Sequence, residues 1–187
     1  MAFFTFLLLL CQPAAADIFV SGYITTDTTW DDTSQPYVVT GHIYIAGGAT
    51  LTIDPGVEVQ ISQNLNIYVG YNSTGYLVAD GAPGNEILFT KRAGNSVWDK
   101  IYFTNWAGAG SRISHAVIDQ GGRGGAAVEL YACADHVTID NTTIQNSYRN
   151  GLYMRGDATP VLSNNTYLNN PGYPIDVDPG TSISAVD

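Results

Sequence analysis

Two stretches of the chain, HVTIDNTTIQN at 136–146 and PVLSNNTYLNN at 160–170, are blurred copies of each other. They are offset by about 24 residues, and the same spacing recurs in two apolar series. The first series is evenly spaced and comprises Leu65, Phe89, Ile113, Val137 and Val161. The second has one longer step, after Ile101, and a slightly shorter final step, and comprises Ile53, Leu77, Ile101, Val128, Leu152 and Ile175. A period in the low twenties, carried by short segments, predicts a solenoid.

The segments inside each repeat read as short β-strands. HIYIAGG, VEVQI and EILFT alternate apolar and polar residues, which predicts strands with one buried face. At about 3.3 Å per residue, roughly 24 residues make a perimeter of roughly 79 Å, enough for three short strands around an apolar core. We therefore predict an all-β fold, a single-stranded parallel β-helix of about seven rungs of roughly 24 residues. Stacked rungs place like residues above one another, so Asn141 and Asn165 should form a structural asparagine ladder.

Two longer stretches resemble a known family. YVVTGHIYIAGGATLTIDPGVEVQI at 37–61 looks like the opening rungs of secreted right-handed parallel β-helix proteins, and GLYMRGDATPVLSNNTYLNN at 151–170 resembles their pectate-lyase-like repeat. The resemblance covers most of the chain from about Tyr37 onward. It implies a right-handed coil, in line with the rule for parallel crossovers. It implies no particular activity.

The chain divides into three predicted parts. Residues 1–16, MAFFTFLLLLCQPAAA, resemble a signal peptide, because a short apolar run precedes small residues suited to cleavage. Residues 17–36 are expected to be an N-terminal cap in which Trp30 covers the first rung. Residues 37–187 should form the β-helix. TSISAVD at 181–187 reads as a further strand with no polar cap, so we expect either a truncated end or an end that pairs with further rungs or another chain.

The charge and the cysteine content of the chain indicate which partners and which disulfides are expected. The formal net charge of −10 disfavours nucleic acid and anionic membrane surfaces. No segment outside residues 1–16 is apolar and long enough to insert into a membrane, so a secreted, extracellular or cell-surface location is expected. The predicted mature chain has one cysteine, Cys133, which excludes an internal disulfide and favours a small buried apolar role.

The repeat also predicts a surface patch. If Ile101, Val128, Leu152 and Ile175 point inward, the residues after them point outward. The predicted carbohydrate-binding residues are Tyr102, Glu129, Tyr131, Tyr153, Arg155, Asp176 and Asp178, with Thr104 heading the second outward column. Tyrosine rings suit sugar rings, and charged side chains hydrogen-bond hydroxyl groups. The alternative is that these positions hold ordinary surface residues, since tyrosine and threonine favour strands.

The favoured function is a secreted or cell-surface β-helix that acts as a non-catalytic binding or adhesion element and contacts polysaccharide. Because the family that the chain resembles includes polysaccharide lyases and hydrolases, one alternative is a polysaccharide lyase or glycoside hydrolase on the same face. For a lyase, the resemblance implies that Arg155 would be the base and that Asp176 and Asp178 would be calcium ligands. For an inverting hydrolase, Glu129 and Asp176 would be the two carboxyl groups. No catalytic residue is assigned and no other cofactor is expected, because no complete catalytic motif is present. A second alternative is a structural rung array within a longer surface adhesin.

Overall fold

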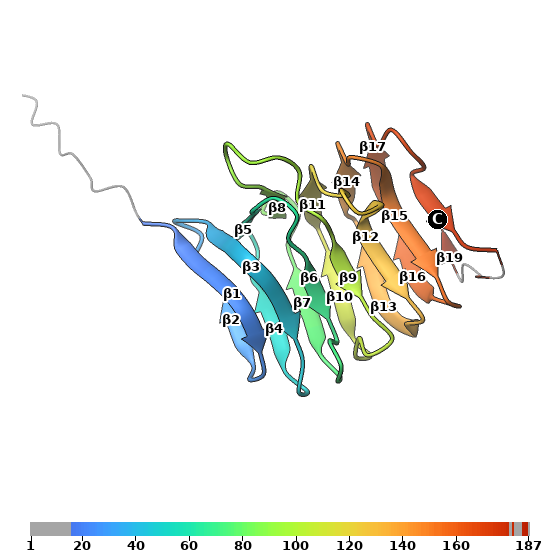
Figure 1. Ribbon diagram of the computed structural model, residues 1–187, viewed down its shortest axis with the longest axis horizontal. Helices are drawn as coiled ribbons and strands as arrows, with labels where there is room; N and C mark the ends of the chain where they lie inside the picture. Colours follow the sequence, from blue (N-terminus) through green and yellow to red (C-terminus); the bar gives the residue numbers. More distant parts are fainter. Residues whose placement is uncertain (1–15, 180, 182–184, 187) are drawn as a thin grey trace, which may run out of the picture.

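Within the residues that the structure describes, the protein is a parallel β-solenoid of nineteen strands. The computed structural model describes residues 16–179, 181 and 185–186, so most of the predicted signal peptide lies outside the described residues. The chain winds through about six turns rather than about seven. Figure 1 shows the strands following one another from the first residues to the last along the long axis of the molecule. The described part of the chain contains no helix that could cross a bilayer.

Three walls enclose the core. The first wall is the seven-stranded sheet of β2 (Thr28–Trp30), β4 (Thr50–Ile53), β7 (Tyr76–Asp80), β10 (Ser111–Ser114), β13 (Ala134–Asp140), β16 (Thr159–Ser163) and β19 (Ala185–Val186). The second wall consists of β5 (Glu58–Ile61), β8 (Ile87–Lys91), β11 (Ala116–Asp119), β14 (Thr143–Gln145) and β17 (Thr166–Leu168). The third wall consists of β6 (Ile67–Val69), β9 (Ile101–Phe103), β12 (Ala126–Tyr131), β15 (Asn150–Arg155) and β18 (Ile175–Val177).

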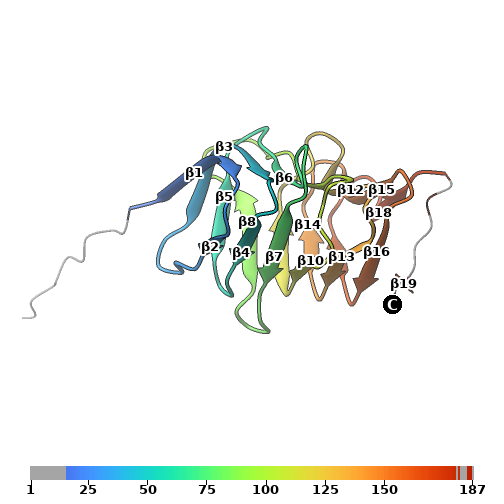
Figure 2. The same ribbon diagram turned by 90° about the horizontal axis from the view of Figure 1, so that it is seen from below.

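Two long strands join the second and third walls into one twelve-stranded sheet. The first half of β3 (Tyr37–Ile45) pairs with β5 and its second half pairs with β6, while β1 (Ile18–Ile24) pairs along β3. All these pairings are parallel, as a solenoid requires. In Figure 2, strands β6, β12 and β15 of the third wall lie toward the top of the view, and strands β4, β7, β10 and β13 of the first wall lie below them.

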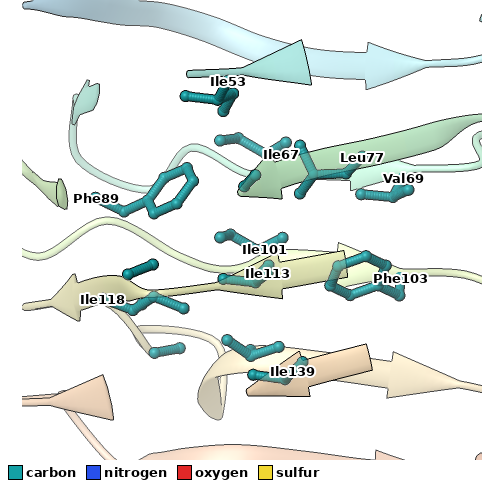
Figure 3. Close-up of a cluster of buried hydrophobic side chains, with 14 of the residues drawn as sticks. Ile53, Ile67, Val69, Leu77, Phe89, Ile101, Phe103, Ile113, Ile118 and Ile139 are labelled. Carbon is teal, nitrogen blue, oxygen red and sulfur yellow. The ribbon is translucent and has the colours of Figure 1, made fainter. Parts of the chain in front are cut away.

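The interior is filled by side chains that alternate along each strand. Figure 3 shows Ile67 and Ile101, from successive turns of the third wall, facing Leu77 and Ile113 of the first wall. All four are fully buried, as is Phe103. Each such side chain contributes about 1.5–3 kcal/mol of hydrophobic stabilisation. Cys133 is also buried, and burial raises its pKa to about 11, which keeps it a neutral thiol in the core.

The register differs from both predicted apolar series. The second series is correct from Ile101 onward, because Ile101, Val128, Leu152 and Ile175 are aligned partners in the third wall. Its first two members, Ile53 and Leu77, lie in the first wall instead, and Ile53 pairs with Ala79 rather than with Leu77.

In the first series, no two successive members are aligned partners. Leu65 lies before β6, and Phe89 lies in β8 of the second wall. Ile113 pairs with Ile139 rather than Val137. Val161 pairs with Thr138 and is 42% exposed, so the buried position falls to Leu162.

The physical reason is that the coils have unequal lengths. Ile67 and Ile101 are aligned although the coil between them is far longer than the repeat, because a long loop precedes β9. Later coils are slightly shorter than the repeat, as between Leu152 and Ile175. Residues separated by a fixed number of positions therefore fall on different walls, or on different faces of one wall, in successive coils. The same long loop lowers the number of turns below the predicted seven.

The asparagine ladder is also displaced by one residue. Asn141 donates its backbone N–H to Ser163 O, and it shares positive φ with Asn164 at the corner between the first and second walls. Asn165 lies beside Thr142 instead: its Oδ1 accepts from Thr142 N at 3.1 Å, and its Nδ2 donates to Ile139 O at 2.7 Å. A direct amide-to-amide bond occurs at the next corner, from Asn169 Nδ2 to Asn146 Oδ1 at 3.2 Å.

Residues 17–36, the predicted N-terminal cap, supply β1 and β2, which pair in parallel with β3 and β4. Trp30 is buried, as expected, and its ring stacks on Tyr37 with 5.0 Å between centroids. At the other end, β19 continues the first wall by pairing with β16. Most of the remaining predicted strand at 181–187 lies outside the described residues.

Candidate functional site

The third wall carries the predicted outward column in the predicted order. Glu129 of β12 pairs with Tyr102 of β9 on one side and with Tyr153 of β15 on the other. Tyr153 in turn pairs with Asp176 of β18. The second predicted column also has its expected neighbours, because Tyr131 pairs with Arg155. The repeat spacing therefore located these rungs correctly.

A cleft of about 440 Å³ opens over this part of the third wall. Five of the seven predicted residues line it, namely Tyr102, Glu129, Tyr153, Arg155 and Asp178. The sequence interpretation missed the other five lining residues, which are Asn66, Tyr68, Asp99, Lys100 and Gly124. The cleft is therefore mainly polar and charged, with tyrosine rings among its walls.

Glu129 is the electrostatic centre of this cleft. Its side chain is 6% exposed, and its two oxygens accept from two cations, Lys100 Nζ at 2.6 Å and Arg155 Nε at 2.7 Å. Arg155 Nη2 also donates to Tyr102 Oη at 3.1 Å. Burial by itself would lower the pKa of Arg155, but the hydrogen bond to Glu129 and its charge raise that pKa above the usual value. Arg155 is thus a fixed cation.

Asp178 and Asp176 occupy different surroundings. Asp178 lines the cleft and accepts a hydrogen bond from Tyr153 Oη at 2.6 Å. Asp176 does not line the cleft, and its Oδ2 accepts from Asn150 Nδ2 at 2.8 Å. Among the residues that the structure describes, no group of three or more His, Cys, Asp or Glu side chains could hold a metal ion. Calcium binding at these two aspartates stays a prediction.

The long loop before β9 delivers Asp99 and Lys100 to the cleft. Trp98 anchors that loop, because its fully buried ring donates Nε1–H to Asp119 O at 2.8 Å. Asp99 then donates its backbone N–H to Leu65 O at 2.9 Å, which fixes the loop to the preceding turn. On the other side, Gly124 N donates to Asp99 Oδ1 at 2.6 Å. The glycine-rich stretch at 121–125 therefore closes one rim of the cleft.

A second, smaller cavity of about 180 Å³ adjoins the first and shares Tyr68 and Tyr102 with it. Tyr131 lies here, 37% exposed, with the Arg155 guanidinium 4.6 Å from its ring centroid. Trp106, which the sequence interpretation overlooked, also lines this cavity and is 49% exposed. The second cavity therefore offers two aromatic rings to solvent.

Thr104 lines the second cavity and positions the Trp106 turn there. Its side chain is buried, and its hydroxyl donates to Gly70 O while accepting from Trp106 N at 3.1 Å. Gly70, in the coil below, has φ +76° and leaves no room for a side chain beneath that turn. Thr104 and Gly70, on adjacent coils, therefore hold Trp106 at the second cavity.

The tyrosine column continues through the earlier coils. Tyr23, Tyr44, Tyr68 and Tyr102 are successive partners in the register. Along the first coils the rings stack on one another, with centroids 4.8 Å apart for Tyr23 and Tyr44 and 5.2 Å apart for Tyr44 and Tyr68. Rings stacked in this way turn their edges and hydroxyl groups toward solvent. In the second cavity, the exposed aromatic residues are Trp106 and Tyr131.

The sequence contained a signal for this longer column. The triplets Ile-Tyr-Ile at 43–45, Ile-Tyr-Val at 67–69 and Ile-Tyr-Phe at 101–103 each place a tyrosine between two inward apolar residues. The unequal steps between these triplets hid the pattern from a search at fixed spacing. Lys100 and Asp99 lie in an irregular loop, and residue periodicity carries no information about such a loop.

The fold and the cleft together define a parallel β-helix protein with a polar, aromatic-edged cleft on one outer wall. The family model described as a pectate-lyase-like beta helix domain matches residues 22–101, and the one described as a right handed beta helix region matches residues 90–186. The chain belongs to the right-handed β-helix family, which confirms the predicted fold and handedness. No curated protein sequence and no solved structure matches the chain.

The hydrogen bond between Tyr153 and Asp178 predicts an alkaline loss of stability. That bond, followed by burial, raises the pKa of Tyr153 to about 12 in the folded protein, against about 10 in an unfolded chain. Because the folded state favours the neutral phenol, its contribution is complete below pH ~10 and is lost as the pH rises to ~12. In urea unfolding across this range, Tyr153→Phe should show a smaller alkaline loss than the wild type.

Tyr167 provides the control for this measurement. Burial also raises its pKa to about 12, and it lies in β17 of the second wall, away from the cleft. Tyr167→Phe should remove its own share of the alkaline loss and leave the share of Tyr153 intact. An alkaline loss in Tyr153→Phe as large as that of the wild type would contradict the assignment.

Proposed function

We propose that the protein is a secreted or cell-surface β-helix that binds glycans without catalysis, and that the cleft of the third wall is its binding site. The observation that carries this proposal is the pairing of fixed polar groups with exposed aromatic faces. Glu129 holds Lys100 and Arg155 in ion pairs, and Trp106 and Tyr131, both partly exposed, line the adjoining second cavity. Sugars combine polar hydroxyl groups with apolar ring faces, and such a surface matches both.

The same contacts favour binding over catalysis. A lyase that used Arg155 as its base would need that guanidinium to lose a proton, and Glu129 raises its pKa instead. A hydrolase that used Glu129 as general acid would need a proton on one carboxylate oxygen. Both oxygens of Glu129 accept charged hydrogen bonds from Lys100 and Arg155. The cleft groups are therefore arranged as recognition elements.

A glycan array followed by titration tests this function. The wild type should bind at least one oligosaccharide, and Trp106→Ala and Tyr131→Ala should each weaken that binding by at least about tenfold, as the loss of an aromatic anchor does at a binding site. Tyr173→Ala is the matched control, because Tyr173 is 65% exposed and lines neither cavity. The proposal fails if no glycan binds, or if Trp106→Ala and Tyr131→Ala both bind as tightly as the control.

A further inference from the structure

The charge arrangement in the cleft identifies the class of glycan, on the premise that the proposed function is correct. Lys100 and Arg155 are the two basic residues that line it, and both are paired with Glu129. The Lys100 side chain is 12% exposed, and its Nζ also lies 3.3 Å from Gly124 O, to which it donates. A carboxylate of an incoming ligand would therefore compete with a buried carboxylate that is already in place.

Two further acids lie on the rim of the cleft. Asp99 and Asp178 bring the lining residues to three carboxylates against two cations. The whole chain carries a formal net charge of −10. A polyanionic chain approaching this surface meets repulsion over a distance of about one Debye length, roughly 8–10 Å at moderate salt. The site thus opposes an acidic polymer both at contact and during approach.

Neutral sugars meet no such opposition. Their hydroxyl groups can donate to the carboxylates of Asp99 and Asp178, whose remaining lone pairs are acceptors. Their apolar ring faces can lie on Trp106 or Tyr131, which line the adjoining second cavity that shares Tyr68 and Tyr102 with the cleft. Carboxylate acceptors beside aromatic faces are suited to uncharged pyranose rings.

We propose that this cleft selects neutral oligosaccharides over uronic acid chains, and that Glu129 enforces the selection by holding Lys100 and Arg155 in ion pairs. Glu129 is a specificity residue in this proposal, since it acts on the ligand through the two cations. Removal of its charge would leave both cations to attract a uronate carboxylate.

Isothermal titration of the intact wild-type protein gives the first test. The probes are neutral hexasaccharides (cello-, xylo-, manno- and laminarihexaose) and two uronate hexasaccharides (galacturonate and mannuronate). At least one neutral probe should bind about tenfold more tightly than either uronate, and its affinity should change little between about 50 and about 500 mM NaCl. Tighter wild-type binding of a uronate would overturn the selectivity while leaving the glycan-binding function in place. Failure of all probes and of the array would remove the function itself.

The Glu129→Gln variant tests the role of the carboxylate. The ratio of uronate to neutral affinity should rise about tenfold, and the gain should fall as salt is added. Glu58→Gln is the matched control, because it removes the same charge from β5 of the second wall and should leave the ratio unchanged. Circular dichroism establishes that both variants are folded. An unchanged ratio in folded Glu129→Gln would refute the assigned role, and an unfolded variant leaves the wild-type comparison to decide the selectivity.

Discussion

Phe103→Ala should lower the free energy of unfolding by about 3–5 kcal/mol, the range for truncating a buried phenylalanine. Phe103 is fully buried in β9, among the apolar side chains of the interior (Figure 3). The preceding residue, Tyr102, borders the cleft. The Phe103 ring packs against neighbouring coils, and the rigid pairing of β9 with β6 and β12 limits how far the backbone can collapse into the cavity. Urea unfolding followed by tryptophan fluorescence would measure the loss.

Phe19→Ala is the control for this prediction. Phe19 is 59% exposed in β1, and its described ring partner is the Arg92 guanidinium, 5.4 Å from the ring centroid. Its truncation should cost less than about 1 kcal/mol. Equal losses for the two variants would mean that the interior of the third wall is not packed as described. A smaller loss for Phe103→Ala than for Phe19→Ala would reverse the assignment of core and surface.

Gly70→Ala should weaken both stability and glycan binding. An added Cβ would collide with the backbone carbonyl of Trp106 and with Ala107 N, and Gly70 has φ +76°. The backbone conformation costs about 1–2 kcal/mol for a residue with a side chain, and the collision adds about 1–3 kcal/mol. Because the Trp106 turn must move, we expect at least a tenfold loss of affinity in the titration described above.

Gly48→Ala separates the two contributions. Gly48 has φ +84°, but nothing lies within 4 Å of an added Cβ. This variant should show only the cost of the backbone conformation and should bind glycan normally. If Gly70→Ala and Gly48→Ala lost equal stability and both kept full binding, the close approach of the two coils beneath Trp106 would be refuted.

The fold was predictable from the sequence because a solenoid repeats one local rule. Alternating apolar residues and a regular period were sufficient to predict parallel coils and the neighbours of Glu129. The register failed where coil length changed, as at the loop before β9 and at Val161. A one-residue change in coil length exchanges inward and outward positions, so the position of Val161 depended on a step that the repeat did not fix.

Only the residues of the candidate site that lie on strands were predictable from the sequence. Residues on strands β9, β12 and β15 followed from alternation, whereas Lys100, Asp99 and Trp106 come from loops whose paths depend on buried anchors such as Trp98. The column positions also did not reveal that Glu129 holds two cations at once. Side chains on separate coils make these contacts, and their geometry depends on packing that sequence spacing does not encode.

The strict neighbour-to-neighbour pairing of coils has a consequence for how such a protein can change. Each strand of a wall bonds only to the strand before it and the strand after it, so interactions rarely skip a level. If one complete circuit of the chain were duplicated or deleted, the strands on either side of it could still pair, and most of the fold would be unchanged. The proposed binding surface spans several adjacent circuits, so its chemistry could be altered by exchanging a single layer, in the manner of a stack whose members are individually replaceable.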